Sequence, residues 1–242
     1  MIPRVLIDSR LEPGAHFSPS KEQRHYLTRV LRLRPGDRVQ VFDGRGGRFE
    51  ALLAEDSAQQ TGLQIAARID PCPESPLSIT LAQCLSSADK MDWTIEKAVE
   101  LGVSAIQPLL SKRSVVRLDE HRVRSRLEHW QRIVVAACMQ CGRDLLPTVA
   151  APVPLERWLE QRDRARGAIV LSPDANTALS GLPLATTAID LLVGPESGLA
   201  PQEVSSCLAA GFQAARLGPR VLRTETAGLT AIAVLQARAG DL

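Results

Sequence analysis

From Leu77 onward, short apolar runs alternate with stretches in which apolar residues recur every three or four positions. A short apolar run between turn residues is typical of a buried strand, whereas the longer period is typical of an amphipathic helix. The alternation predicts an α/β domain whose mainly parallel sheet is covered by helices on both faces. The strands are expected at 77–82, 105–110, 168–171 and 189–193, and the helices at 90–101, 123–141 and 155–161.

Residues 1–70 have a different pattern, because their apolar runs are brief and are separated by glycine-rich turns. Several short strands spaced in this way predict a small β-barrel. Three prolines then fall within residues 71–76, a composition that favours a stiff, extended linker. We therefore expect one domain at 1–70 and a second at 77–242. The barrel strands are expected at 39–43, 48–53 and 63–69.

One helix is expected inside the barrel domain, at residues 19–30, with Ser18 or Ser20 as its N-cap. The period of its apolar positions defines the face that should turn inward. The residues on this face are Tyr26, Val30 and Leu33.

The last helix should begin near Thr224, whose hydroxyl can cap the first turn, and Glu225 then interacts favourably with the helix dipole. Residues 229–237 are apolar or small on almost every face. A helix of this kind is buried on all sides, so it lies either in the core or in a subunit interface.

Composition is that of an ordinary globular protein. Of the 242 residues, 45% are hydrophobic and 23% are charged, and no apolar run is long enough to span a bilayer. The N-terminus has no signal-peptide pattern, so we expect a cytoplasmic protein with no membrane partner. The five cysteines should be reduced thiols, with Cys138 and Cys141 on one helix face rather than in a metal or redox pair.

Net charge is only +2, but the basic residues are unevenly distributed. Residues 20–48 hold eight lysines and arginines against three acidic residues, and residues 111–132 hold seven against three. Such a concentration is expected where a protein binds a phosphate backbone. A solvated basic surface is the alternative interpretation.

Two segments near the C-terminus share one design, Ile189-Asp-Leu-Leu-Val-Gly-Pro-Glu-Ser-Gly198 and Leu217-Gly-Pro-Arg-Val-Leu-Arg-Thr-Glu-Thr-Ala227. Each has a Gly-Pro turn between an expected strand end and a helix start, where backbone groups are open to a flat heteroaromatic ligand. The spacing fits neither a dinucleotide fingerprint, nor a P-loop, nor a nucleophile elbow. No cluster of metal ligands occurs in the sequence, so no metal is expected.

These two segments resemble the signature of the 16S rRNA (uracil-N3)-methyltransferase family, which belongs to the trefoil-knotted SPOUT methyltransferases. Four upstream blocks resemble that family in the same order. They are Arg24-His-Tyr-Leu-Thr-Arg-Val-Leu-Arg-Leu-Arg-Pro-Gly-Asp37, Glu96-Lys-Ala-Val-Glu-Leu-Gly-Val103, Ser111-Lys-Arg-Ser114 and Gln140-Cys-Gly-Arg143. The resemblance implies a PUA-like RNA-binding barrel, a knotted methyltransferase domain whose C-terminal helix passes through a loop of the chain, and a homodimer.

The resemblance also implies the reaction, which is methylation of N3 of one uridine in 16S rRNA by S-adenosylmethionine. The target is uridine-1498 in the conventional numbering, and the assembled small subunit is the expected substrate, with free RNA as the alternative. Two other functions stay open: ribose 2′-O methylation by an enzyme of the same superfamily, and a non-catalytic RNA-binding factor in ribosome assembly.

By resemblance, the backbone of three loops holds the cofactor. The residues are Leu171, Gly194, Pro195, Glu196, Gly198, Leu199, Leu217, Gly218, Leu222, Arg223, Thr224, Thr226 and Ala227. The uracil N3 proton must also be removed, or the forming anion stabilised, by a group near the cofactor. Glu225, Glu196 and Arg223 are the catalytic candidates, and for Glu225 a structural role in the helix start is the alternative.

The candidate RNA-binding residues are Arg24, His25, Arg29, Arg32, Arg34, Lys112, Arg113 and Arg143. Two positions depart from the family pattern. Ser197 stands where the family has glycine, and a φ above zero there would cost about 1 kcal/mol. Met139 stands where relatives often carry glutamate, which removes an acidic candidate from that position.

Overall fold

The computed structural model describes residues 2–55, 61–114 and 120–242, without the side chains of residues 120 and 121. The chain forms two compact units. The N-terminal unit comprises Met1–Pro73 and Cys138–Leu146, and the C-terminal unit comprises Glu74–Ala137 and Pro147–Leu242. The predicted domain boundaries placed residues 138–146 in the second domain, with residues 138–141 at the end of a long helix.

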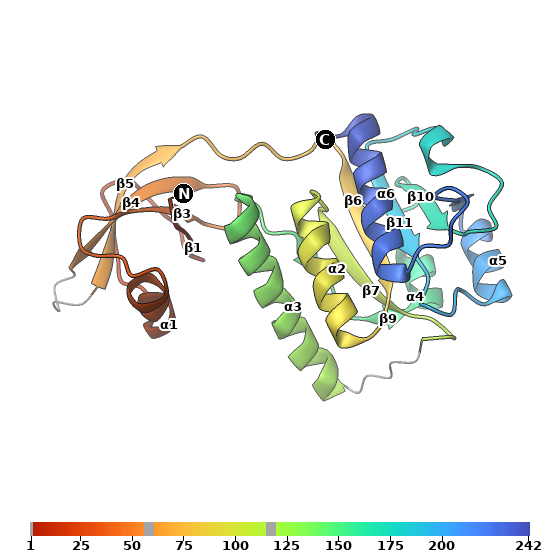
Figure 1. Ribbon diagram of the computed structural model, residues 1–242, viewed down its shortest axis with the longest axis horizontal. Helices are drawn as coiled ribbons and strands as arrows, with labels where there is room; N and C mark the ends of the chain where they lie inside the picture. Colours follow the sequence, from red (N-terminus) through yellow and green to blue (C-terminus); the bar gives the residue numbers. More distant parts are fainter. Residues whose placement is uncertain (1, 56–60, 115–119) are drawn as a thin grey trace. The chain divides into compact units, whose positions relative to one another are not determined.

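The N-terminal unit is built on one sheet with the strand order β1-β3-β4-β5-β2 (Figure 1). Strands β3, β4 and β5 pair antiparallel, and their alternate residues enter an aliphatic core. The three predicted strands are confirmed, whereas β1 and β2 are too short for their period to be read from sequence. The strands are β1 (Arg4–Leu6), β2 (His16–Phe17), β3 (Arg38–Phe42), β4 (Arg48–Glu55) and β5 (Thr61–Ile69).

The predicted helix of this unit is α1 (Lys21–His25), which continues as the π-helical turn η1 (Tyr26–Val30). Ser20 is its N-cap and forms a capping box with Gln23. The predicted apolar face was wrong at Val30, which is 58% exposed, because the wider π turn shifts the helical register. Leu27 is fully buried in its place.

Asp144 holds the segment 138–146 within the N-terminal unit. Its carboxylate is almost fully buried and accepts hydrogen bonds from Arg4 Nη2 at 2.7 Å and from the backbone N–H of Cys72 at 2.7 Å. Arg48 Nε lies 2.9 Å from Asp144 Oδ2, the oxygen that also accepts from Cys72. A buried carboxylate needs such partners, so this segment is fixed by its charge.

The C-terminal unit contains a parallel sheet with the order β12-β10-β11-β6-β7-β8, and β9 pairs with β7. The prediction of an α/β unit with a parallel sheet is confirmed. The strands are β6 (Ser78–Cys84), β7 (Ala105–Leu110), β8 (Thr148–Val149), β9 (Val153–Pro154), β10 (Gly167–Leu171), β11 (Ala188–Val193) and β12 (Gln213–Ala215).

Helices cover both faces of this sheet. On one face α6 packs on α2, β6 and β11, and Figure 1 shows α2 and α6 side by side. On the other face, α4 and α5 bury Trp158, Leu159 and Cys207 against alternate strand residues. The helices are α2 (Ala88–Glu100), α3 (Glu120–Cys141), α4 (Leu155–Gln161), η2 (Leu179–Gly181), α5 (Pro201–Ala209) and α6 (Thr224–Ala239).

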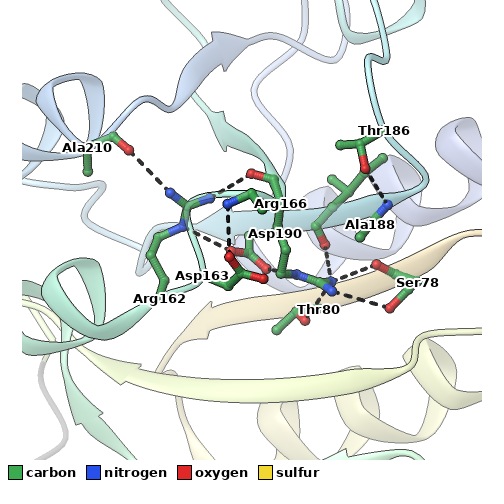
Figure 2. A network of polar contacts seen from close by, with 11 residues as sticks. Ser78, Thr80, Arg162, Asp163, Arg166, Thr186, Ala188, Asp190 and Ala210 are labelled. Atoms are coloured by element: carbon green, nitrogen blue, oxygen red, sulfur yellow. Dashed lines mark hydrogen bonds and ion pairs between the residues drawn. The ribbon is translucent and has the colours of Figure 1, made fainter.

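A buried ion network fixes the amino ends of three central strands, as Figure 2 shows. Asp190 of β11 accepts from Arg162 Nε at 3.0 Å and from Arg166 Nε at 2.7 Å, and it is only 2% exposed. Arg166 also donates to the Ser78 carbonyl at 2.7 Å and to Thr80 Oγ1 at 3.1 Å, both on β6. One carboxylate therefore links β10, β11 and β6 through two guanidinium groups.

Replacing Asp190 with asparagine should destabilise the protein by about 3 kcal/mol, because two largely buried guanidinium groups lose their counter-ion. Urea unfolding would measure the loss. Asp163→Asn is the matched control, since Asp163 is exposed and its carboxylate accepts from the backbone N–H of Ala165, two residues further along the chain. Equal stability of the two variants would contradict a structural role for Asp190.

None of the five cysteines is joined in a disulfide. Cys84, Cys138 and Cys207 are buried, whereas Cys72 and Cys141 are half-buried. Burial raises the pKa of Cys84 to about 12 and that of Cys207 to about 11. Both buried thiols are therefore protonated at neutral pH and shielded from reagents.

A thiol reagent should react readily with Cys72 and Cys141 in the native protein, and with all five cysteines after denaturation. The pKa of the Cys84 thiol is about 9.0 in the unfolded chain and about 12 in the folded protein. The contribution of this buried thiol to stability is therefore fully present below pH 9 and decreases as the pH rises toward 12. Mass spectrometry after labelling checks the first outcome. Labelling of Cys84 in the folded protein would contradict it.

Candidate functional site

A cavity of about 580 Å³ lies at the carboxyl ends of β10, β11 and β12, at the sheet edge opposite the Asp190 network. Parallel strands present their carboxyl ends at one edge, which is where open α/β sheets bind ligands. The volume suits a small organic ligand. The wall consists of residues 170–174, 193–199, 215–218 and 220–224, together with Lys90, Val204 and Ala227.

The loop 194–198 is packed too closely for larger residues at its first position. A Cβ on Gly194 would lie 3.2 Å from Leu199 Cγ and 3.3 Å from the Leu199 backbone nitrogen. Gly198 has a φ of 70° and closes the turn by donating to the Pro195 carbonyl at 2.8 Å. A side chain would therefore be tightly packed at Gly194 and strained at Gly198.

The backbone strain that a positive φ would cause at Ser197 does not occur, because the positive φ of this loop falls on Gly198. Its hydroxyl donates to the Arg113 carbonyl at 3.1 Å, and Arg113 Nη1 donates to the Ser197 carbonyl at 3.2 Å. Serine at this position thus joins the loop that follows β7 to the cavity loop.

Thr224 begins α6 as expected, but its hydroxyl does not cap the helix. The hydroxyl donates to the Gly194 carbonyl at 2.6 Å and accepts from Gln83 Nε2 at 2.9 Å. The capping prediction failed because the Gly194 carbonyl lies closer in space than sequence separation could indicate. The result is a buried polar chain from β6 through α6 to the cavity loop.

Charges of both signs meet on one side of the cavity. Lys90 Nζ lies 3.2 Å from Glu196 Oε1 and 3.8 Å from Glu225 Oε2. Lys90 and Glu196 line the cavity, whereas Glu225 does not. The Glu225 side chain is 13% exposed, and its Oε2 is buried without a hydrogen bond to the residues that the structure describes.

The structure brings nearly all the predicted cofactor residues to this cavity. Thr226 is the exception, because it is exposed on the outer side of the first turn of α6. Of the catalytic candidates, Glu196 and Arg223 line the cavity. Glu225 does not line it but lies 3.8 Å from Nζ of the cavity residue Lys90. Sequence reasoning missed Lys90, Arg216 and residues 172–174, since no local motif marks them.

Most of the predicted RNA-binding residues are exposed. His25, Arg29, Arg32 and Arg34 project from α1, η1 and the following loop, and Arg24 is half-buried. Lys112 and Arg113 are exposed in the loop after β7; a hydrogen bond with Glu156 raises the pKa of Lys112. Arg143 differs from the expectation, because it is buried with 7% exposure and its carbonyl accepts from Arg4.

Comparison with known proteins accounts for both units. Residues 73–236 match the family model described as an RNA methyltransferase domain, and residues 19–59 match an RNA methyltransferase PUA domain. The chain belongs to this family of RNA methyltransferases. In the described residues no helix is long and apolar enough to cross a membrane, and no group of three or more His, Cys, Asp or Glu could hold a metal.

Similar proteins match over most of their length. Ribosomal RNA small subunit methyltransferase E of Buchnera aphidicola (subspecies Acyrthosiphon pisum) is 33% identical over 240 residues, 99% of this chain and 95% of the relative. The Synechocystis protein of the same name is 37% identical, covering 89% and 71%. A crystal structure of the Neisseria gonorrhoeae protein of that name, bound to S-adenosyl methionine, is 38% identical, with a TM-score of 0.93 and full coverage of both chains.

Gly194→Ala should weaken binding of S-adenosylmethionine about 10-fold or more, because the added methyl group meets backbone at Leu199 and the loop must shift by a few tenths of an ångström. Isothermal titration measures the affinity. Gly181→Ala is the matched control, since a Cβ there meets nothing within 4 Å. Unchanged binding by Gly194→Ala would mean that this loop does not hold the cofactor.

Proposed function

We propose that this protein transfers the methyl group of S-adenosylmethionine to N3 of one uridine in 16S ribosomal RNA, uridine-1498 in the conventional numbering. The observation that carries the proposal is the cavity at the carboxyl edge of the sheet, built from the same two Gly-Pro loops that resemble the uracil-N3 methyltransferases. The similar proteins named as small-subunit methyltransferase E support the choice of ribosomal RNA.

The cavity suits the cofactor chemically. S-adenosylmethionine has an apolar-faced adenine and a tail with a carboxylate, an ammonium and a sulfonium group. Backbone groups at Gly194 to Leu199 and Leu217 to Leu222 can hold the flat ring, and cavity side chains of both signs can hold the tail. The sulfonium is already a strong electrophile, so the protein has to align the nucleophile and remove one proton.

The exposed arginines of the N-terminal unit are proposed to hold the phosphate backbone of the RNA. Arg29, Arg32 and Arg34 are solvent-exposed on one short segment, and guanidinium groups bind phosphate strongly. Arg32 has a φ of 56°, an uncommon conformation for a residue with a side chain. Arg29 therefore lies in η1, whereas Arg32 and Arg34 lie in the loop that follows it.

A homodimer in the cytoplasm, and a trefoil knot in the C-terminal unit, complete the proposal on the basis of the resemblance. Ala233 and Val234 of α6 are half-buried, which leaves part of an apolar helix face for a second subunit. Light scattering at micromolar concentration tests the dimer. A monomer would contradict it.

The reaction is tested with purified protein, labelled S-adenosylmethionine and small ribosomal subunits that lack the modification. We expect one methyl group per subunit, located at N3 of uridine by nuclease digestion and mass spectrometry. A methyl group on a ribose 2′ oxygen would favour the alternative enzyme. Cofactor binding without transfer to subunits or to free 16S RNA would favour a non-catalytic assembly factor.

Arg29→Ala combined with Arg32→Ala should weaken RNA binding. It should also lower the slope of log affinity against log salt concentration by about one to two units, because the loss of two phosphate contacts means that fewer counter-ions are released on binding. Affinity for S-adenosylmethionine should stay unchanged, because both residues belong to the N-terminal unit. Arg164→Ala, at an exposed position of the other unit, is the control. An equal loss of cofactor affinity would refute the assignment.

A further inference from the structure

Lys90 is a cavity residue to which the sequence motifs assign no role. It lies in the first turns of α2, about a hundred residues before the loops that form most of the cavity wall. Its Nζ donates to Glu196 Oε1 at 3.2 Å, and Glu196 belongs to the loop that follows β11. The side chain is 28% exposed, so it is largely enclosed yet reaches the cavity.

A second carboxylate holds the same ammonium group. Glu225 Oε2 lies 3.8 Å from Lys90 Nζ and, within the described part of the chain, is buried without a hydrogen bond of its own. A buried carboxylate oxygen left without a hydrogen bond is costly, and a nearby cation offsets part of that cost. Glu225 thereby places a second carboxylate beside the ammonium group of a cavity residue.

We propose that Lys90 is a catalytic residue of the methyl transfer, and that Glu225 is the residue that positions it. This inference rests on the proposed function. The Lys90 ammonium donates a hydrogen bond to a carbonyl oxygen of the uracil ring beside N3. That oxygen gains negative charge as N3 loses its proton, so a fixed cation stabilises the transition state more than the neutral ring.

Glu196 accepts the proton, because it is the carboxylate that both lines the cavity and contacts Lys90. The N3–H bond breaks and its proton moves to the Glu196 carboxylate. The N3 electron pair forms the bond to the methyl carbon, and the electron pair of the carbon–sulfur bond stays on sulfur. A sulfonium, a neutral ring and a carboxylate become a thioether, a methylated ring and a carboxylic acid, so charge balances.

The experiment compares Lys90→Met with Lys97→Met in single-turnover transfer to unmodified small subunits. Lys97 lies on the same helix and pairs with Glu96 and Glu100, at 2.7 Å each, away from the cavity wall. Lys90→Met should lower the rate about 10²-fold with unchanged cofactor affinity. Lys97→Met should keep the wild-type rate.

The pH dependence distinguishes a catalytic role from a structural one. The difference in single-turnover rate between the wild-type protein and Lys90→Met should shrink as the pH rises, because the uracil ring then loses its N3 proton unaided. The double variant Lys90→Met with Glu225→Gln restores charge balance in the protein. The double variant should have a melting temperature close to that of the wild-type protein. Its rate of methyl transfer should remain as low as that of Lys90→Met, because the cation is still missing.

Three outcomes would overturn the inference. They are a wild-type rate in Lys90→Met, recovery of the rate by the double variant, and a loss confined to cofactor affinity, which would make Lys90 a cofactor contact. Failure of the wild-type protein to methylate any uridine N3 refutes the proposed function itself, so the two failures are distinguishable.

Discussion

The parallel pairing of β10, β11 and β12 is the constraint on which the rest of the C-terminal unit depends. Parallel strands bring their carboxyl ends to one edge, so the loops after these three strands meet although about forty residues separate them along the chain. The opposite edge is fixed by Asp190 and its two arginines. The ion pairs at the amino ends of the strands therefore hold the sheet together, and the loops at the carboxyl ends are left to bind a ligand.

The cavity is formed largely by backbone, and its shape depends on contacts that lie outside it. Gln83 donates to Thr224, and Thr224 donates to the Gly194 carbonyl. These two hydrogen bonds orient the loop 194–198 from its buried side, and the hydrogen bonds between Ser197 and Arg113 hold it from its exposed side. A site built from main chain gains its precision from such supporting contacts.

Charged residues have two different roles within the N-terminal unit. Asp144 is buried between Arg4 and Arg48 and organises the N-terminal unit, so these basic residues are structural. Arg29, Arg32 and Arg34 are exposed and remain available to a polyanion. Arg143 shows that a basic residue in a family motif can be buried, and that exposure has to be known before a role in binding is assigned.

The sequence by itself determined the order and type of the main elements, because apolar periodicity and turn residues are local signals; the strand at 105–110 and the helix at 155–161 were predicted at their observed bounds. The two Gly-Pro loops were recognised for the same reason. Only the tertiary structure decided the register of the π turn, the bonding of the Thr224 hydroxyl and the place of residues 138–146. It alone placed Lys90 beside Glu225, since contacts between residues so far apart in sequence depend on how the helices pack on the sheet.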